Sequence, residues 1–296
     1  MKKSTKEFFK LYGWRHPFLF LHGYYYITKL DRYVSLVAKL MRLLTRNFPK
    51  HSFTLNWFAG RYHAKVVRTE DARKFVTLQR DIKVDPSIAE QVIPFKIANQ
   101  IILKNPEHIT VMDCACRLEK KEHCTPIQVC LVIGEPGASF VADNGARVHA
   151  RRIESEEALR IVKDSHDRDW VHTIWLKDAM GNRTYAMCNC CRCCCVGMEG
   201  MRLLQTLKIE NPPRAILPSG YVAVIDEEKC TGCGVCEETC PFDASEIDTV
   251  AEKARVLGDK CMGCGVCIDN CRQGASNLMK DPKKGIPLDL DELQPR

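Results

Sequence analysis

The chain has 296 residues, 45% of them hydrophobic and 27% charged, with a net charge of +7 and 18 cysteines. This composition is that of a soluble globular protein with two or three domains. The length, the lack of an apolar signal-peptide core in MKKSTKEFFKLYGW and the tight clustering of the cysteines argue against a small, secreted, disulfide-bonded protein. No run of eighteen apolar residues occurs, so no transmembrane helix is predicted.

Residues 1–100 form the first segment, which contains no cysteine and is rich in aromatic residues. Residues 1–80 carry 17 Lys and Arg against 4 Asp and Glu, whereas the rest of the chain is acidic. An apolar stripe over residues 31–48 predicts an amphipathic helix. The stripe consists of Val34, Val37, Leu40, Met41 and Leu44. Three interpretations remain open: packing on its own domain, docking on an anionic membrane surface, and docking on an acidic partner protein.

Residues 101–216 form the second segment, which holds ten cysteines. Its pattern predicts an α+β module. A short apolar stretch, ITVMDCACR, opens it, and a helix follows with Ser155 as N-cap and an end near Asp167. VHTIWL and RTYAMC flank a turn and predict a hairpin. Residues 196–207 predict a last helix that stops before Pro212.

Residues 217–280 form the third segment, an internal repeat with a period of 31 residues. Each copy, KCTGCGVCEETC and KCMGCGVCIDNC, has the CxxCxxCxxxC spacing that holds [4Fe–4S] clusters. Three thiolates in one loop bind one cube, and the fourth cysteine of each run binds the other cube. We therefore assign one cluster to Cys230, Cys233, Cys236 and Cys271, and the other to Cys261, Cys264, Cys267 and Cys240.

These two runs resemble those of the bacterial two-cluster ferredoxins, over about a fifth of the chain. The resemblance implies one-electron transfer through paired clusters, in a fold of two short hairpins and two short helices. YVAVID, before the first run, fits the first strand of that fold. The tail, residues 281–296, is expected to be extended or loose.

The cysteines of the second segment fall into two blocks, the second of which is CNCCRCCC at residues 188–195. Within it, Cys188, Cys191 and Cys194 repeat the CxxCxxC spacing. Successive helical residues diverge by about 100°, so either a loop wraps one cluster or different cysteines face different centres. We predict at least one further iron–sulfur centre held jointly by both blocks. An all-thiolate zinc site is the alternative, and reduced, inert cysteines or an adventitious disulfide are the remaining possibility. The candidate ligands are Cys114, Cys116, Cys124, Cys130, Cys188, Cys190, Cys191, Cys193, Cys194 and Cys195.

Residues 100–280 as a whole resemble uncharacterised ferredoxin-fused iron–sulfur proteins of anaerobic bacteria and archaea. The shared order is a CxCR block, a helix like EEALRIV, a CNCCxCCC block and a two-cluster ferredoxin. The resemblance implies anaerobic redox metabolism.

The fold class predicted is therefore α+β, with a helical N-terminal segment, a cysteine-rich α+β module and a C-terminal ferredoxin-like domain. The predicted function is an electron carrier or a subunit of a redox complex in the cytoplasm, acting with redox partner proteins and located peripherally at the inner membrane face if residues 1–80 dock there. Two alternatives stay open: an oxidoreductase whose middle cluster is catalytic, and a redox or metal sensor. Motifs for nucleotide or flavin binding are absent from the sequence, and no nucleic-acid partner is expected.

Overall fold

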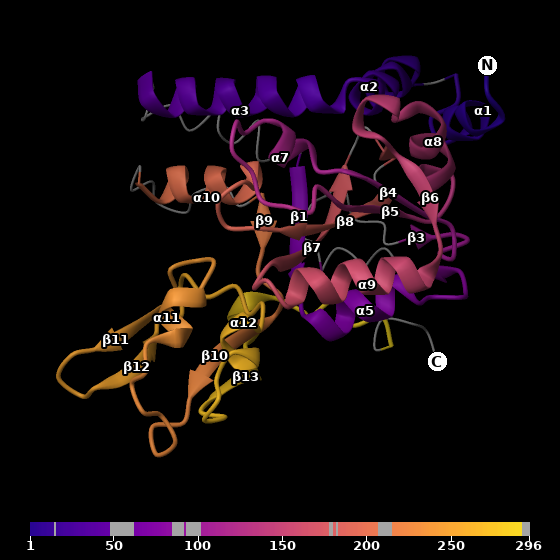
Figure 1. The fold of residues 1–296 in the computed structure, drawn as a ribbon. Helices are drawn as coiled ribbons and strands as arrows, with labels where there is room; N and C mark the ends of the chain where they lie inside the picture. Colours follow the sequence, from indigo (N-terminus) through magenta and orange to yellow (C-terminus); the bar gives the residue numbers. More distant parts are fainter. Residues whose placement is uncertain are drawn as a thin grey trace.

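The computed structural model describes residues 1–14, 16–47, 62–84, 92, 102–177, 180–181, 183–206 and 215–291. It has an α+β fold in which a cysteine-rich body carries a smaller C-terminal unit (Figure 1). This is the predicted fold class.

A seven-stranded sheet forms the centre of the body, in the order β6-β4-β5-β8-β7-β1-β9. Its strands are β1 (Tyr62–Val67), β4 (Ile109–Asp113), β5 (Gln128–Ile133), β6 (Arg151–Ile153), β7 (Val171–Lys177), β8 (Arg183–Cys190) and β9 (Ile216–Leu217). Neighbouring strands run antiparallel except β1 and β9, which are parallel. The predicted hairpin is the β7–β8 pair, in which Val171 lies opposite Cys190. A short separate pair joins β2 (Ile82–Lys83) to β3 (Ile102–Leu103).

Helices cover both faces of the sheet (Figure 1). One face carries α5 (Thr69–Val76) and α9 (Ser155–His166). The other face carries α1 (Lys3–Lys10), α2 (Pro17–Thr28), α3 (Leu30–Asn47), α7 (Ala115–Leu118), α8 (Gly137–Asn144) with the 3-10 turn η1 (Ala146–Val148), and α10 (Val196–Thr206). Side chains alternate along each strand, so Val111 and Leu131 pack toward α5 and α9 while Met112 and Cys130 pack toward the other layer.

The predicted helices occur with small differences at their ends. The helix expected over residues 31–48 is α3, and that expected from Ser155 is α9. Glu154, and not Ser155, is the N-cap of α9, and its side chain makes no capping hydrogen bond. The predicted stop of the last helix before Pro212 lies outside the described residues.

The C-terminal unit contains two small antiparallel sheets and two short helices. One sheet pairs β10 (Tyr221–Ile225) with β13 (Ser276–Lys280), and the other pairs β11 (Ser245–Asp248) with β12 (Lys253–Val256). The helices are α11 (Val235–Thr239) and α12 (Val266–Asp269), each of which begins after a glycine. The predicted first strand, YVAVID, is β10.

Two segments at the ends of the chain join the body more closely than the sequence suggests. β1 comes from the N-terminal segment, yet it pairs with β7 inside the sheet, so the boundary expected near residue 100 does not coincide with the edge of the sheet. The tail is expected to be extended or loose, and its described part is not loose, because Leu288 and Leu290 are buried in the core beneath α5 and α9. A 3-10 turn, η3 (Pro282–Lys284), begins that part. None of the helices in the described ranges combines the length and the hydrophobicity of a transmembrane span.

Candidate metal centres

The eight cysteines of the repeat lie around two small cavities, each of about 20 Å³. Four of them line the first cavity: Cys230, Cys233, Cys236 and Cys271. The other four line the second: Cys240, Cys261, Cys264 and Cys267. In both cavities the fourth cysteine of one run joins the first three of the other. This is the grouping that the spacing predicts for two cubes.

Backbone N–H groups donate to the ligand sulfurs with the same 31-residue period. Ala223 N–H donates to Cys261 Sγ and Ala254 N–H to Cys230 Sγ, both at 3.4 Å. Two further alanines donate in the same way to the fourth cysteine of each run, Ala244 to Cys240 at 3.2 Å and Ala275 to Cys271 at 3.3 Å. Such donors favour the charged form of a sulfur ligand and help to set a cluster's reduction potential.

Two glycines allow the ligand loops to fold this tightly. Gly232 has φ +66° and Gly263 has φ +64°, in the left-handed region. A Cβ at Gly232 would lie 2.2 Å from the Glu252 carbonyl oxygen, and one at Gly263 would lie 2.3 Å from that of Tyr221. No side chain fits there without moving backbone.

The ten cysteines of the middle module separate into two groups. The first group, here called the six-thiol ring, is a closed cycle of neighbours linked by side-chain hydrogen bonds. In cyclic order its members are Cys114, Cys116, Cys195, Cys190, Cys188 and Cys130. They come from the end of β4, from α7, from β5 and from β8 and the loop after it. The fold thus joins both sequence blocks in one site.

Two members of the six-thiol ring, which are not adjacent in it, have thiol pKa values below the ordinary one. Hydrogen bonds from Cys116 and Cys130 hold the pKa of the Cys114 thiol well below its ordinary value. Hydrogen bonds from Cys116 and Cys190 do the same for the pKa of Cys195. Thiolates are the form in which cysteine binds metals.

The second group, here called the four-thiol site, consists of Cys124, Cys191, Cys193 and Cys194. All four sulfurs lie within 4.8 Å of one another. Cys124 Sγ lies 3.0 Å from Cys193 Sγ, which lies 3.3 Å from Cys194 Sγ. Thiolates around one tetrahedral zinc ion, at ~2.3 Å from the metal, lie about 3.8 Å apart. The donor set therefore fits a single ion, since a cube is larger and gives each thiolate its own iron. Cys193 is exposed, so this site is nearer the solvent than the ring.

Arg117 lies between the two groups and is completely buried. Its guanidinium stacks on the Trp170 ring, 3.9 Å from the centroid, and donates to the carbonyl oxygens of Pro126 and, at 3.3 Å, Asn189. Among the described ion pairs it has no carboxylate partner. Burial alone would lower the pKa of its guanidinium, but the neighbouring side chains of Cys114 and Cys191 raise it. A buried cation without a counter-charge is costly. The natural counter-charge is the thiolate clusters on either side.

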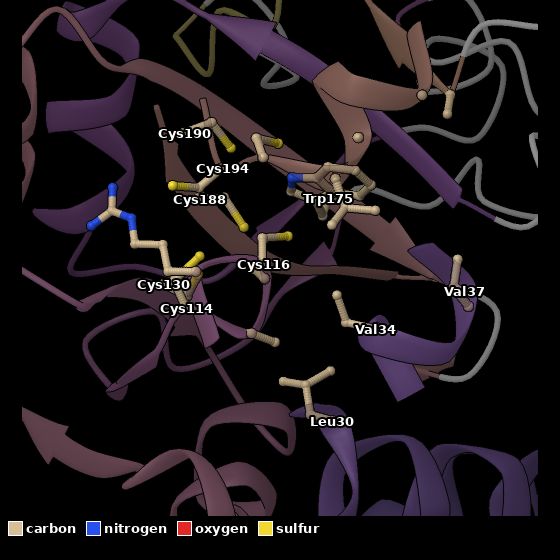
Figure 2. Close-up of a pocket in the computed structure, with 18 of the residues that line it drawn as sticks. Leu30, Val34, Val37, Cys114, Cys116, Cys130, Trp175, Cys188, Cys190 and Cys194 are labelled. Atoms are coloured by element: carbon tan, nitrogen blue, oxygen red, sulfur yellow. The ribbon is translucent and has the colours of Figure 1, made fainter. Parts of the chain in front are cut away.

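A cavity of about 190 Å³ opens above the six-thiol ring. All six ring sulfurs belong to residues that line it, and α3 supplies its opposite wall through Leu30, Val34 and Val37 (Figure 2). The apolar stripe of α3 therefore faces inward, which favours packing on its own domain over membrane docking. Leu40 is the exception, because it is partly exposed and does not line the cavity.

α3 is held over this cavity by an ion-pair network. Arg42 donates to Glu119 of the segment after α7 at 2.8 Å and to Glu199 of α10 at 2.6 Å. Lys120 also contacts Glu199, at 2.8 Å. The hydrogen bond from Arg42, followed by that from Lys120, lowers the pKa of Glu199 to about 2. The network thus stays ionised at neutral pH.

The middle module contacts the second cavity of the C-terminal unit directly. One apolar cluster contains Cys190 and Cys195 of the ring together with Met262, and Cys264 packs against it. Arg192, the arginine of CNCCRCCC, reaches the Cys240 carbonyl oxygen at 3.4 Å and pairs with Asp243. Of the two ferredoxin-type sites, the one with Cys240, Cys261, Cys264 and Cys267 is therefore the nearer to the ring.

The structure distributes the predicted middle residues in a way that the spacing did not indicate. The CxxCxxC triplet is not brought together, because Cys188 lies in the ring while Cys191 and Cys194 lie in the four-thiol site. This grouping favours the second of the two alternatives for CNCCRCCC, in which different cysteines face different centres. The sequence reasoning missed the role of Arg117, whose signal was a basic residue directly after a CxC pair. The ligand assignment itself stays a prediction.

Comparison with known proteins identifies the C-terminal segment. The family model of a 4Fe-4S dicluster domain matches residues 223–272. One subunit of an ion-translocating oxidoreductase complex from Methanosarcina acetivorans is 32% identical over 83 residues, which are 28% of this chain and 28% of that protein. The chain thus matches little more than a quarter of the length of this curated relative. The resemblance to two-cluster ferredoxins is confirmed, and residues 223–272 are a 4Fe-4S dicluster domain attached to a second cysteine-rich module.

Proposed function

We propose that this chain is an electron-transfer subunit in which the dicluster domain exchanges single electrons with a further iron–sulfur centre in the six-thiol ring. The observation that carries the proposal is the apolar cluster shared by ring cysteines Cys190 and Cys195 and by Met262 and Cys264 of the dicluster domain. Direct packing of two ligand sets brings their centres close. Similarity to one subunit of an ion-translocating oxidoreductase complex supports a role beside redox partner proteins.

The two cysteine groups of the middle module are assigned different occupants. Six thiols exceed what one tetrahedral ion needs, so the ring is suited to a polynuclear iron–sulfur centre. The four-thiol site fits one zinc or iron ion, which would join the loop with Cys124 to the loop after β8. When bound, the ring's centre would accept and release one electron at a time, and Arg117 would balance its negative charge.

The test is anaerobic purification followed by measurement of iron, acid-labile sulfide and zinc per chain. We expect at least about 12 irons with matching sulfide, because two cubes account for about 8. A Cys195→Ser variant should lose only the iron above about 8, and a reductive titration followed by electron paramagnetic resonance (EPR) should lose one signal. Iron at about 8 in the wild-type protein would contradict the proposal, and a redox sensor built on free thiols would then be favoured.

A second part of the proposal concerns docking on an anionic membrane surface. The turn after α1 and one side of α2 expose Trp14 and Phe18, at 87% and 83%, together with Leu21 and Tyr25. Aromatic residues of this kind are enriched at the membrane interface, and the exposed lysines Lys3, Lys6 and Lys10 of α1 would favour anionic lipid. The surface proposed to contact the membrane therefore lies on α2, and not on α3.

Vesicle flotation tests this docking. The protein should float with vesicles that contain anionic phosphatidylserine and not with purely zwitterionic ones, and the binding should weaken as salt is raised. Replacing Trp14 and Phe18 by Ser should abolish flotation. A Val250→Ser variant is the matched control, since Val250 is equally exposed but lies in the dicluster domain. Equal flotation of the aromatic double variant would exclude this surface.

A further inference from the structure

We infer that the cavity between the six-thiol ring and α3 is a binding chamber for a small uncharged molecule that ligates the ring's iron–sulfur centre. This inference rests on the proposed function, because it requires a centre in the ring. It makes the middle module a candidate site of chemistry rather than a relay alone.

The size of the cavity is the first argument, and the dicluster domain provides the internal comparison. Each of its two cysteine-lined cavities, where a cube is expected, measures about 20 Å³, whereas the chamber measures about 190 Å³. The chamber is thus roughly nine times larger than a site built for one cube. Apolar protein cavities of about 150 Å³ admit molecules as large as benzene. Space therefore remains above a cluster held in the ring.

The chemistry of the walls is the second argument. Figure 2 shows the labelled cysteines on one side of the chamber and Leu30, Val34 and Val37 on the other. Among the described lining residues, the only possible metal donors on the walls from α2, α3 and α10 are the Tyr26 phenol and the weak thioethers of Met41 and Met201. An incoming ligand on that side would not have to displace a thiolate.

The polarity of the chamber selects the class of ligand. Apart from the ring thiolates, Arg117 is the only charged residue among the described lining residues, and its two terminal guanidinium nitrogens already donate to the carbonyl oxygens of Pro126 and Asn189. The Asn189 amide is likewise engaged, by His172 at 2.6 Å and by the Val129 carbonyl oxygen at 2.7 Å. Apart from the buried Nε of Arg117, these groups offer no free partner to a charged or strongly hydrated molecule. Small uncharged molecules with a soft donor atom fit, since they bind iron and tolerate an apolar wall.

Carbon monoxide is the probe, because it is small, uncharged and a ligand of reduced iron. One iron–carbon bond forms and no bond breaks. Added to the reduced, fully loaded protein, it should shift the EPR signal of the ring's centre and give a new infrared carbonyl band. The two cubes of the dicluster domain, with four thiolates each, should not respond.

Variants of α3 locate the binding. Val37→Phe fills the chamber and should weaken carbon monoxide binding at least tenfold with iron and sulfide content unchanged. Leu36→Phe, the adjacent and exposed position of the same helix, is the matched control and should behave as wild type. Should Val37→Phe lose iron, Val34→Phe provides the same test.

Three results would overturn the inference, and they are distinguishable. Full iron content with no spectral response to carbon monoxide would contradict ligand binding in the chamber. The electron-transfer proposal would not be affected. Iron at the level of the dicluster domain alone would overturn both. Equal binding by the wild-type, Val37→Phe and Leu36→Phe proteins would place the ligand elsewhere.

Discussion

The dicluster domain and the middle module hold cysteines by different means. In the dicluster domain two copies of one short loop each supply three thiols, so the site is local in sequence and tightly closed, with a cavity of about 20 Å³. In the middle module the thiols come from β4, α7, β5 and β8, and the ring opens onto about 190 Å³. A repeat specialised for electron transfer needs a cavity only large enough for its cluster. A site whose thiols come from several strands can leave one side of the cluster open to a ligand. The dicluster domain is thus suited to carrying electrons, and the middle module to binding a ligand at its metal centre.

The largest effect is expected from a substitution at Arg117, which should destabilise the metal sites of the middle module and leave the dicluster domain intact. Arg117→Met removes the cation between the two thiol groups and leaves their negative charge uncompensated in the interior. Loss of one partner of a buried charged pair typically costs about 3–5 kcal/mol. We expect the iron above about 8 per chain to be lost, while the signals of the two cubes persist. Metal analysis and EPR spectra check this.

Arg117→Lys separates charge from shape at the same position. It keeps one positive charge but cannot donate to two carbonyl oxygens while stacking on Trp170. Partial retention of the middle iron is expected. If Arg117→Met kept the full iron content, the assigned electrostatic role would be wrong.

The second prediction concerns glycine substitutions in the ligand loops of the dicluster domain. Gly263→Ala places a Cβ 2.3 Å from the Tyr221 carbonyl oxygen at a positive φ, so the ligand loop must shift. The cluster beside Cys261 should be lost, with destabilisation of about 1–3 kcal/mol from the strained backbone alone. Gly232→Ala should do the same to the other cluster.

Gly258→Ala is the control for both glycine variants, because a Cβ there meets no atom within 4 Å and φ is not positive. Iron content and denaturant unfolding distinguish the three proteins. Loss of stability in Gly258→Ala equal to that in Gly263→Ala would show that the contact geometry is not the cause.

The third prediction distinguishes the two groups of the middle module. Cys193→Ser should remove a single metal ion per chain and leave the iron and sulfide of the ring unchanged, because Cys193 belongs only to the four-thiol site. In the wild-type protein a chelator should extract that ion before any ring iron, since Cys193 is exposed and three ring cysteines are buried. Simultaneous loss of both metals would mean that the ten cysteines form one centre.

The sequence predicts the dicluster domain well and the middle module incompletely, for a physical reason. In CxxCxxCxxxC each ligand lies within one loop, so the spacing fixes the site, and even the donors Ala223 and Ala254 follow the 31-residue period. In CNCCRCCC the partners are set by strand register. Cys188 lies opposite Cys130 because β8 pairs with β5 in that register, which no local spacing encodes. The stripe of α3 was visible in the sequence, but its partner, the chamber over the ring, was not.

The smallest effect concerns the junction between the two modules. Arg192 links the loop of CNCCRCCC to Cys240 and Asp243 of the dicluster domain. Its pair with Asp243 is half-exposed, so Arg192→Gln should change the free energy of unfolding by less than about 1 kcal/mol. The rate of electron transfer between the ring and the dicluster domain, followed after rapid photoreduction, should nevertheless fall. Arg255→Gln breaks an equally exposed pair, with Glu246, at the far sheet of the dicluster domain and should leave the rate unchanged. Equal rates in all three proteins would mean that electrons leave the dicluster domain by another face, and the middle module would then lie outside the transfer path.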